Sequence, residues 1–224
     1  MTLPFTTDQF LDVFARYNVA VWPAQLVTYL LGLLCSVVAL RHAKYSSRII
    51  SLILALLWLW MGVVYHFLFF SKINQAAWLF GAVFILQSLS FIYAGVITGR
   101  ISFHFTRDVY GIGGAIILAY AFIIYPAIGY IVGQRYPELP TFGLPCPTTI
   151  FTFGILLWAK PIVPVFVLIV PLVWSFIGFF AALSLNIPED IGLLAAGIAG
   201  TALIVIRNTR ATAALAAEGK TNLR

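Results

Sequence analysis

The stretch FGLPCPTTIFTFG, residues 142 to 154, places a lone cysteine between two prolines, directly before an apolar run. A thiol at a helix N-terminus or beside a cation can become a nucleophile or a ligand, because both surroundings favour the thiolate. Pro147 suits the first turn of a helix, and Thr148 and Thr149 could cap its free amide groups. Cys146 is therefore a reactive thiol or a small residue in a rigid loop, and we predict the structural role.

A second reactive side chain, His66, lies inside the apolar stretch VVYHFLFF. Ionisable residues within a membrane segment are costly and point to function by default, here as a proton acceptor or as a ligand for a soft or borderline metal. The alternative is a neutral imidazole that hydrogen-bonds to a neighbouring carbonyl or tyrosine. His66 and Cys146 are the weak candidates for a metal, and the prediction is no metal site and no cofactor.

Polar residues in or near other apolar runs could line a path for a solute. Amide and hydroxyl side chains often join helices within membranes, so no single one of them indicates a site. A short helix whose N-terminus faces a vestibule attracts anions or polar substrate groups, and interrupted helices are a good pointer to a transporter site. We therefore predict an outward-facing polar vestibule, with substrate-binding residues Gln25, His66, Gln87, Arg135 and Thr149.

The composition predicts that these residues belong to a membrane protein. Of the 224 residues, 62% are hydrophobic and 9% are charged, against about 25% charged in soluble chains, and the mean hydropathy is +1.02. A spanning helix needs about 20 apolar residues, and its backbone must be satisfied internally. The apolar runs predict one all-α domain, 1–224, with seven membrane helices, the fifth of them short, and a cytoplasmic tail at 207–224. The helices are predicted at 20–40, 49–70, 76–98, 110–132, 147–159, 162–183 and 191–206.

Before the first span, residues 8–18 predict a short amphipathic helix on the membrane surface. Thr7 and Asp8 are expected to cap it. Its apolar side is expected to carry Phe10, Leu11, Phe14 and Tyr17 and to lie at the membrane surface.

The basic residues predict an orientation. Seven spans with the N-terminus outside place three of the 13 basic residues outside, namely Arg16, Lys72 and Arg135. The other ten fall inside, namely Arg41, Lys44, Arg48, Arg100, Arg107, Lys160, Arg207, Arg210, Lys220 and Arg224. This is the positive-inside pattern, with the C-terminus inside. The net charge of +6 then needs only anionic lipid headgroups, and no nucleic acid, to explain it.

Two further groups are predicted to be structural. The tryptophans fall mostly near the predicted span ends and are expected to form an interfacial belt; they are Trp22, Trp58, Trp60, Trp78, Trp158 and Trp174. Glu189 and Asp190 follow Pro188 at the start of the last span, where the helix dipole favours acidic residues. They are interpreted as capping residues.

The chain shows signs of an internal repeat. The stretch at 22–32 resembles the one at 146–156, and Trp58, Gly62 and Gly81 recur 116 residues later. Helices one to three and five to seven would then be parallel repeats joined by helix four. This plan is similar in architecture to sugar transporters of the SWEET type; the alternative is chance similarity between apolar segments.

Two stretches carry a family resemblance, YHFLFFSKINQAAWLFGAVFILQ and RYPELPTFGLPCPTTIFTFGILLW. They resemble an uncharacterised family of small bacterial seven-helix inner-membrane proteins, known only as a domain of unknown function. The resemblance implies a multi-pass protein of the bacterial inner membrane and implies no activity.

Because the resemblance implies no activity, the function must be inferred from the residues themselves. The chain shows no recognised catalytic motif. The prediction is a small transporter or channel for an unidentified small solute or ion. Its partners would be membrane lipids and that solute, and assembly into a homo-oligomer is left open. The alternatives are a membrane enzyme or redox or metal-handling component that uses Cys146 and His66, and a scaffold subunit.

Overall fold

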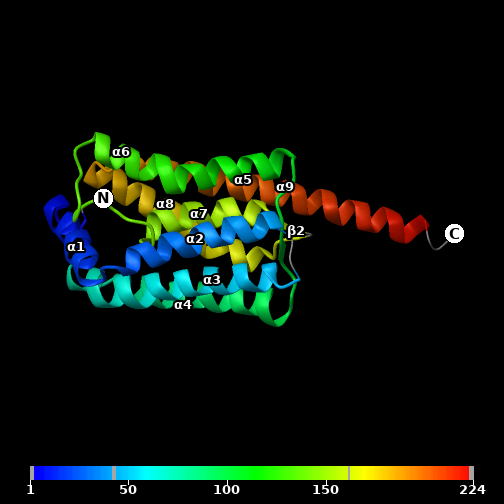
Figure 1. Ribbon diagram of the computed structural model, residues 1–224, viewed down its shortest axis with the longest axis horizontal. Helices are drawn as coiled ribbons and strands as arrows, with labels where there is room; N and C mark the ends of the chain where they lie inside the picture. Colours follow the sequence, from blue (N-terminus) through cyan, green and yellow to red (C-terminus); the bar gives the residue numbers. More distant parts are fainter. Residues whose placement is uncertain (1–2, 42–43, 161, 222–224) are drawn as a thin grey trace.

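The computed structural model describes residues 3–41, 44–160 and 162–221, with side chains described as far as Ala217. The chain forms a helix bundle whose long helices run roughly along one axis (Figure 1). Helix α1, Thr7–Ala20, lies across one end of this bundle, and the last helix projects beyond the other. We call these the α1 end and the sheet end, because the one small sheet of the described ranges lies at the latter.

Six helical segments are long and apolar enough to cross a membrane. They comprise α2 (Ala24–Arg41), α3 with η1 and η2 (Ser46–Trp60, Met61–Phe69, Phe70–Lys72), α4 with η3 (Ala77–Phe91, Ile92–Ile97), α5 with η4 and α6 (Val109–Ala119, Tyr120–Ile124, Tyr125–Ile131), α8 (Val165–Leu185), and η5 with α9 (Pro188–Asp190, Ile191–Thr221). A shorter apolar helix, α7, covers Pro145–Leu157. The prediction of a helical multi-pass membrane protein is confirmed.

The helix boundaries differ from the predicted ones at a few points. Helix α9 continues to Thr221 instead of ending at residue 206, because the sequence ATAALAAEG consists largely of good helix formers. The predicted tail at 207–224 is thus helical as far as residue 221, and residues 222–224 lie outside the described part. Three spans also contain π-helical turns, η1, η3 and η4.

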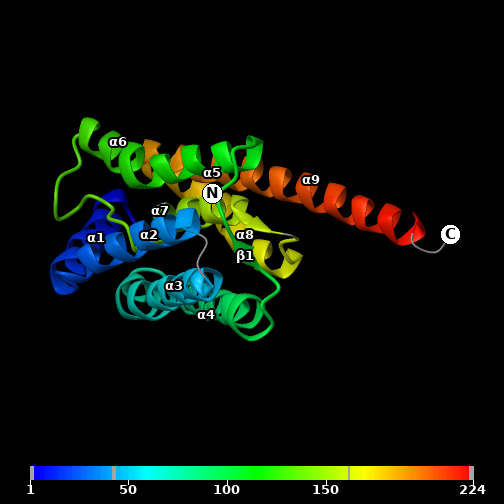
Figure 2. The same ribbon diagram turned by 45° about the vertical axis from the view of Figure 1, so that its right-hand side comes forward.

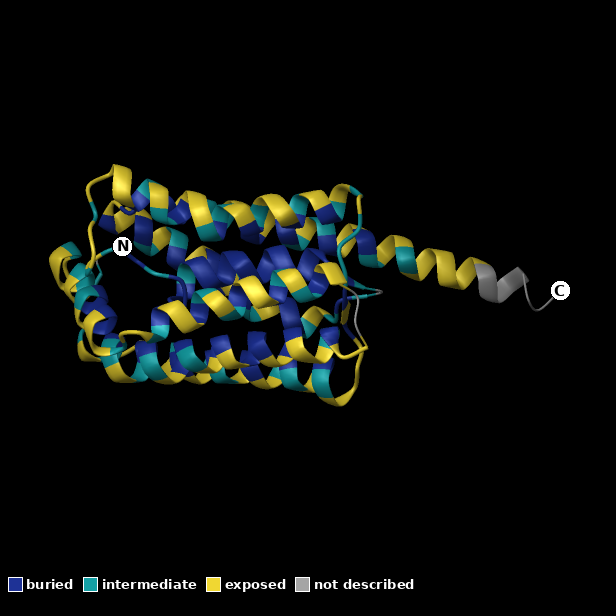
Figure 3. Cartoon of the chain, viewed as in Figure 1, coloured by how far each residue is buried: buried dark blue, intermediate teal, exposed yellow. Residues whose placement is uncertain are grey.

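Helix α7 forms the centre of the bundle. Twelve of its 13 residues are buried, and Cys146 is the half-buried exception. Figure 2 shows α7 between α3 and α4 on one side and α5, α6 and α9 on the other, and Figure 3 shows the same central helix almost entirely buried. Because neighbouring helices surround it, α7 presents no broad face to lipid.

Small residues allow this close packing. A Cβ added to Gly114 of α5 would lie 2.7 Å from the carbonyl oxygen of Gly154 in α7. Glycines at such positions let two helix backbones approach each other within a membrane. The stretch GIGG, residues 111–114, thus holds a close-packing glycine at Gly114.

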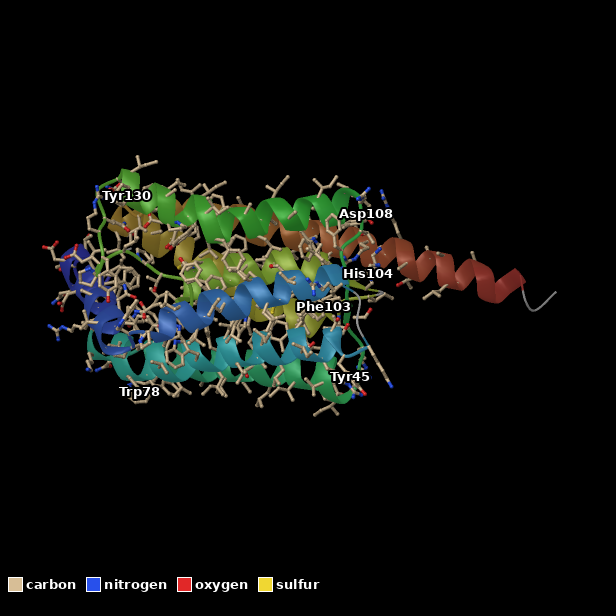
Figure 4. The ribbon with its side chains drawn as sticks, viewed as in Figure 1. Tyr45, Trp78, Phe103, His104, Asp108 and Tyr130 are labelled. Atoms are coloured by element: carbon tan, nitrogen blue, oxygen red, sulfur yellow. The ribbon has the colours of Figure 1, made fainter. Side chains whose placement is uncertain are left out.

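The sheet end is closed by paired polar groups. Strand β1, Ser102–Phe103, pairs antiparallel with β2, Ala159–Lys160, which directly follows α7. The buried Arg207 guanidinium donates from Nη1 to the Leu157 carbonyl at 2.7 Å and from Nη2 to the Leu156 carbonyl at 3.3 Å. It thereby caps the C-terminus of α7, where free carbonyl groups would otherwise be buried. Figure 4 places Phe103, His104 and Asp108 at this end, and Trp78 and Tyr130 at the opposite one.

Helix α1 closes part of the other end. It begins in a capping box formed by Thr6 and Gln9, so the predicted cap at Thr7 and Asp8 is wrong by one residue. Phe14 and Tyr17 lie on one side of α1, as predicted, and that side packs against Tyr65 of η1. Burial raises the pKa of Tyr17 to about 12, so this phenol stays protonated where it accepts a hydrogen bond from Trp60 Nε1 at 2.7 Å.

Candidate functional site

A cavity of about 480 Å³ opens at the α1 end. Its wall is formed by α1, α8, the start of α7, η1, η2 and η5, by the segments before α1 and before α7, and by single residues of α4 and α6. Aromatic and aliphatic side chains make up most of the lining, with Phe5, Phe10, Phe14, Tyr65, Phe70 and Trp174 among them. A largely apolar cavity with a few convergent polar groups is the usual form of a small-molecule site.

The polar side chains that line this cavity include one carboxyl group, Asp190, on η5. Its side chain is only 4% exposed, and Oδ1 accepts a hydrogen bond from the Tyr125 hydroxyl of α6 at 2.7 Å. Both residues line the cavity. Asn186 ends α8 in the left-handed conformation, and Pro188 then starts η5. This turn brings the carboxyl group back against the bundle, close to the start of α7.

Cys146 lies next to this carboxyl group. The thiol lines the cavity beside Asp190 and the Trp174 indole. A Cβ added to Gly178 of α8 would lie 3.5 Å from the Cys146 sulfur, so this glycine leaves room for the thiol. Both cysteines of the chain are free.

His66 is fully buried behind the wall of the cavity. Its ring forms T-shaped contacts with Phe84 and Trp174, with centroids 4.6 Å and 5.2 Å apart. Neither imidazole nitrogen, nor Nε1 of Trp174, has a hydrogen-bond partner among the described residues. These unpaired atoms leave hydrogen-bonding capacity beside the cavity.

A second buried carboxyl group, Glu189, precedes Asp190. It has no exposed surface, and neither carboxyl oxygen has a partner by distance and angle among the described residues. The amide of Gln134 lies against it and can supply a hydrogen bond from Nε2, but no charge. Two neighbouring carboxyl groups are therefore buried at this end of the bundle.

The predicted substrate-binding residues lie apart from one another. Gln25 donates to the Asn18 carbonyl of α1 at 2.6 Å, and Gln87 donates to the Val167 carbonyl of α8 at 2.9 Å. Both amides therefore join helices, which is the common role of such groups in membranes. Thr149 is fully buried in α7, and its hydroxyl has no partner in the described part of the chain.

Arg135 stays at the surface. Its guanidinium donates to the carbonyl groups of Tyr130 and Gln134 and stacks over the Tyr130 ring at 3.7 Å. Of the described side chains that line the cavity, none belongs to the predicted set, although His66 touches the lining residue Trp174.

Sequence reasoning missed the residues that do converge here. Asp190 was interpreted as a cap, but its carboxyl group accepts the Tyr125 hydroxyl inside the bundle. The belt assignment is wrong for Trp58, Trp158 and Trp174, which are buried. One signal for the site was present in the sequence. Glu189 and Asp190 directly precede a long apolar run, and acidic side chains buried within a membrane are costly.

The described residues contain no group of three His, Cys, Asp or Glu side chains arranged to hold a metal ion. Cys146 lines the cavity and His66 does not, and the Trp174 ring contacts the imidazole and lies beside the thiol.

Comparison with known proteins adds a family. The sequence model of a family of unknown function, DUF6064, matches residues 7–215. No curated protein and no solved structure matches the chain.

Proposed function

Since the chain belongs to the DUF6064 family, whose description names no activity, we propose from the geometry of the site that it is a small membrane transporter. Its solute would occupy the cavity at the α1 end. One observation carries this proposal: a cavity of about 480 Å³ with a buried carboxyl group, Asp190, at the start of a helix that can span a membrane. Ionisable groups in such positions commonly mark the path of a substrate or an ion.

The packing of α7 favours a carrier over an open channel. From Pro147 to Leu157, every residue of α7 is buried, and this helix fills the centre of the bundle as far as the sheet end. A solute in the cavity therefore meets packed helices and would cross only if these helices moved. Alternating access of this kind is the usual mechanism of secondary transporters.

The basic residues support an orientation with the α1 end outside. Arg16, Lys72 and Arg135 lie at this end, whereas Lys160 and Arg207 lie at the sheet end. By the positive-inside rule the sheet end would face the cytoplasm, in a bacterial inner membrane. The same proposal includes the predicted parallel repeat and seven spans, of which α7 would be the fifth.

The test is uptake into liposomes that contain the purified chain, with a panel of cationic, neutral and anionic small solutes. Ala181→Trp fills the cavity from α8, and Val173→Trp places the same side chain on the lipid-facing side of that helix, where Val173 is exposed. We expect uptake of at least one class of solute, abolished by Ala181→Trp and retained by Val173→Trp. No uptake of any class, or equal uptake by both variants, would reject the transport role.

A further inference from the structure

The residues that line the cavity indicate which class of solute it would bind. We propose that it selects monovalent organic cations with an apolar body, whose charge Asp190 balances and whose body contacts the aromatic wall. This inference rests on the proposed function, because it names the class of solute for the same cavity.

The charge balance of the site is the first argument. Asp190 and Glu189 are both buried, at 4% and 0% exposure, and neither forms an ion pair among the described side chains. The ion pairs among the described side chains are Arg16 with Asp12 and Lys160 with Asp108, and both pairs lie at the surface. Tyr125 and Gln134 supply hydrogen bonds, but they are neutral. A buried carboxyl group without a counter-charge is costly to ionise, and a cation in the cavity would lower that cost.

The wall of the cavity is the second argument. It brings together aromatic rings from several parts of the chain, among them Phe5, Phe10, Phe70, Phe80, Trp174 and Phe180. Aromatic faces attract cations through their quadrupoles, most strongly where water is excluded, and quaternary ammonium ligands are recognised in this way. The same rings provide apolar contact for an organic body, which an inorganic ion does not have.

Competing ligand classes fit less well. No Lys or Arg is among the described residues that line the cavity, so an anion would meet the Asp190 carboxylate without compensation. A metal ion would need several ligands, whereas Asp190 is the one carboxyl group in this lining and no cluster of three ligating residues occurs in the described part. A small hydrated cation would lose its water to an apolar wall.

The experiment uses the full-length chain purified in detergent, with isothermal titration of benzyltrimethylammonium and tetraphenylphosphonium. Tetraphenylborate, of closely similar shape and opposite charge, is the matched control ligand. We expect at least one of the two cations to bind, and binding to weaken at least tenfold in Asp190→Asn. Asp108→Asn, the same change at the sheet end, should leave binding within twofold. Tetraphenylborate should show no saturable binding.

A second variant keeps the test decisive if Asp190→Asn does not fold. Tyr125→Phe removes only the hydroxyl that donates to Asp190 and should change cation affinity by roughly threefold while leaving tetraphenylborate unaffected. Binding of neither cation to the folded wild-type chain would overturn the inference. So would equal cation affinity in wild type and Asp190→Asn, or saturable binding of tetraphenylborate at this cavity.

The outcome separates this inference from the proposed function. If the cations bind through Asp190 but liposomes show no uptake of them, the ligand class stands and the transport role fails. If a neutral or anionic solute is taken up and Ala181→Trp blocks it, while neither cation binds, transport stands and the ligand class fails.

Discussion

The two ends of the bundle treat their buried polar groups in opposite ways. At the sheet end, the Arg207 guanidinium caps two carbonyl groups, and Asn208 donates to and accepts from the backbone of Val163. At the α1 end, Glu189, His66 and Trp174 keep polar atoms without hydrogen-bond partners in the described structure. Among the described residues, Arg207 Nε and Ser51 Oγ near the sheet end, and Thr201 Oγ1 further into the bundle, are exceptions. Satisfied networks stabilise a fold, whereas unsatisfied buried groups need an explanation, and a ligand supplies one.

Helix α7 connects these two regions. Its C-terminus is held by Arg207 and continues into β2, whereas its N-terminus begins at the cavity with Pro145 and Cys146. One end of the central helix is therefore fixed to its neighbours, and the other faces space that a ligand can fill. We infer that stability comes mainly from the sheet end and selectivity from the α1 end. Mutations at the two ends should separate these properties.

The largest loss of stability is expected from Arg207→Met. The variant leaves the carbonyl groups of Leu156 and Leu157 without their charged donor, and hydrogen bonds to charged groups contribute about 1.5–3 kcal/mol each. The free energy of unfolding in mixed micelles should fall by roughly 3 kcal/mol. Arg210→Met, one turn further along α9 at an exposed position, is the control and should stay within about 0.5 kcal/mol. Similar losses in both variants would remove the special role of the sheet end.

Asn208→Ala should have the next largest effect. The side chain accepts from the Val163 amide at 3.1 Å and donates to the Val163 carbonyl at 2.8 Å. Its removal leaves both backbone groups unpaired, at a cost of about 1–3 kcal/mol. The measurement is again unfolding in mixed micelles, with Thr209→Ala on the exposed side of α9 as the control. A change no larger than that of the control would contradict the comparison.

The bundle could be predicted from the sequence, and the site could not. Apolar runs of about 20 residues leave little choice in a bilayer, so the helices follow from composition and length. The sequence does not say which side of each helix turns inward, and Tyr125, Cys146 and Asp190 lie on different segments. Their convergence follows from the packing of α6, α7 and η5.

Asp190→Asn, at the α1 end, should not destabilise the fold in the way that Arg207→Met and Asn208→Ala do at the sheet end. The amide keeps an acceptor oxygen for the Tyr125 hydroxyl and removes a buried ionisable group that has no counter-charge among the described residues. The free energy of unfolding should therefore fall by no more than about 0.5 kcal/mol, or rise, because the fold no longer buries a carboxyl group that is costly to ionise. Tyr125→Phe, which removes the hydrogen bond instead, should cost about 1 kcal/mol. A larger loss in Asp190→Asn than in Tyr125→Phe would show that the carboxyl group stabilises the fold.

Cys146→Ser sharpens the role of the thiol. We predict that Cys146 is chiefly structural, so the variant should fold and keep solute uptake within twofold of wild type. Pro147→Gly should impair uptake more, because glycine frees the backbone at the entry to α7. Liposome uptake with both variants tests this. A folded but inactive Cys146→Ser, together with selective modification of Cys146 in the native chain, would favour the enzyme or redox alternative instead.

A small, pH-dependent effect is expected at Asp108, which caps α5 at the sheet end. Burial acts to raise the pKa of this carboxyl group. The amides of Gly111 and Tyr110, the Thr106 hydroxyl and Lys160, whose Nζ lies 3.8 Å away, outweigh burial and lower the pKa below its usual 3.8. A carboxyl group with a lowered pKa in the folded state stabilises the fold above its ordinary pKa. That contribution is lost as the pH falls through the lowered value.

Wild type should therefore exceed Asp108→Asn in stability at pH 7 by less than about 1 kcal/mol, since the group is partly exposed and its ion pair is screened. This difference should shrink as the pH falls from 5 toward 3, whereas the offset of the non-titrating control Thr209→Ala should not change with pH. The measurement is unfolding of all three chains at each pH. A difference between wild type and Asp108→Asn that stays constant over this range would mean that the Asp108 charge does not stabilise the sheet end.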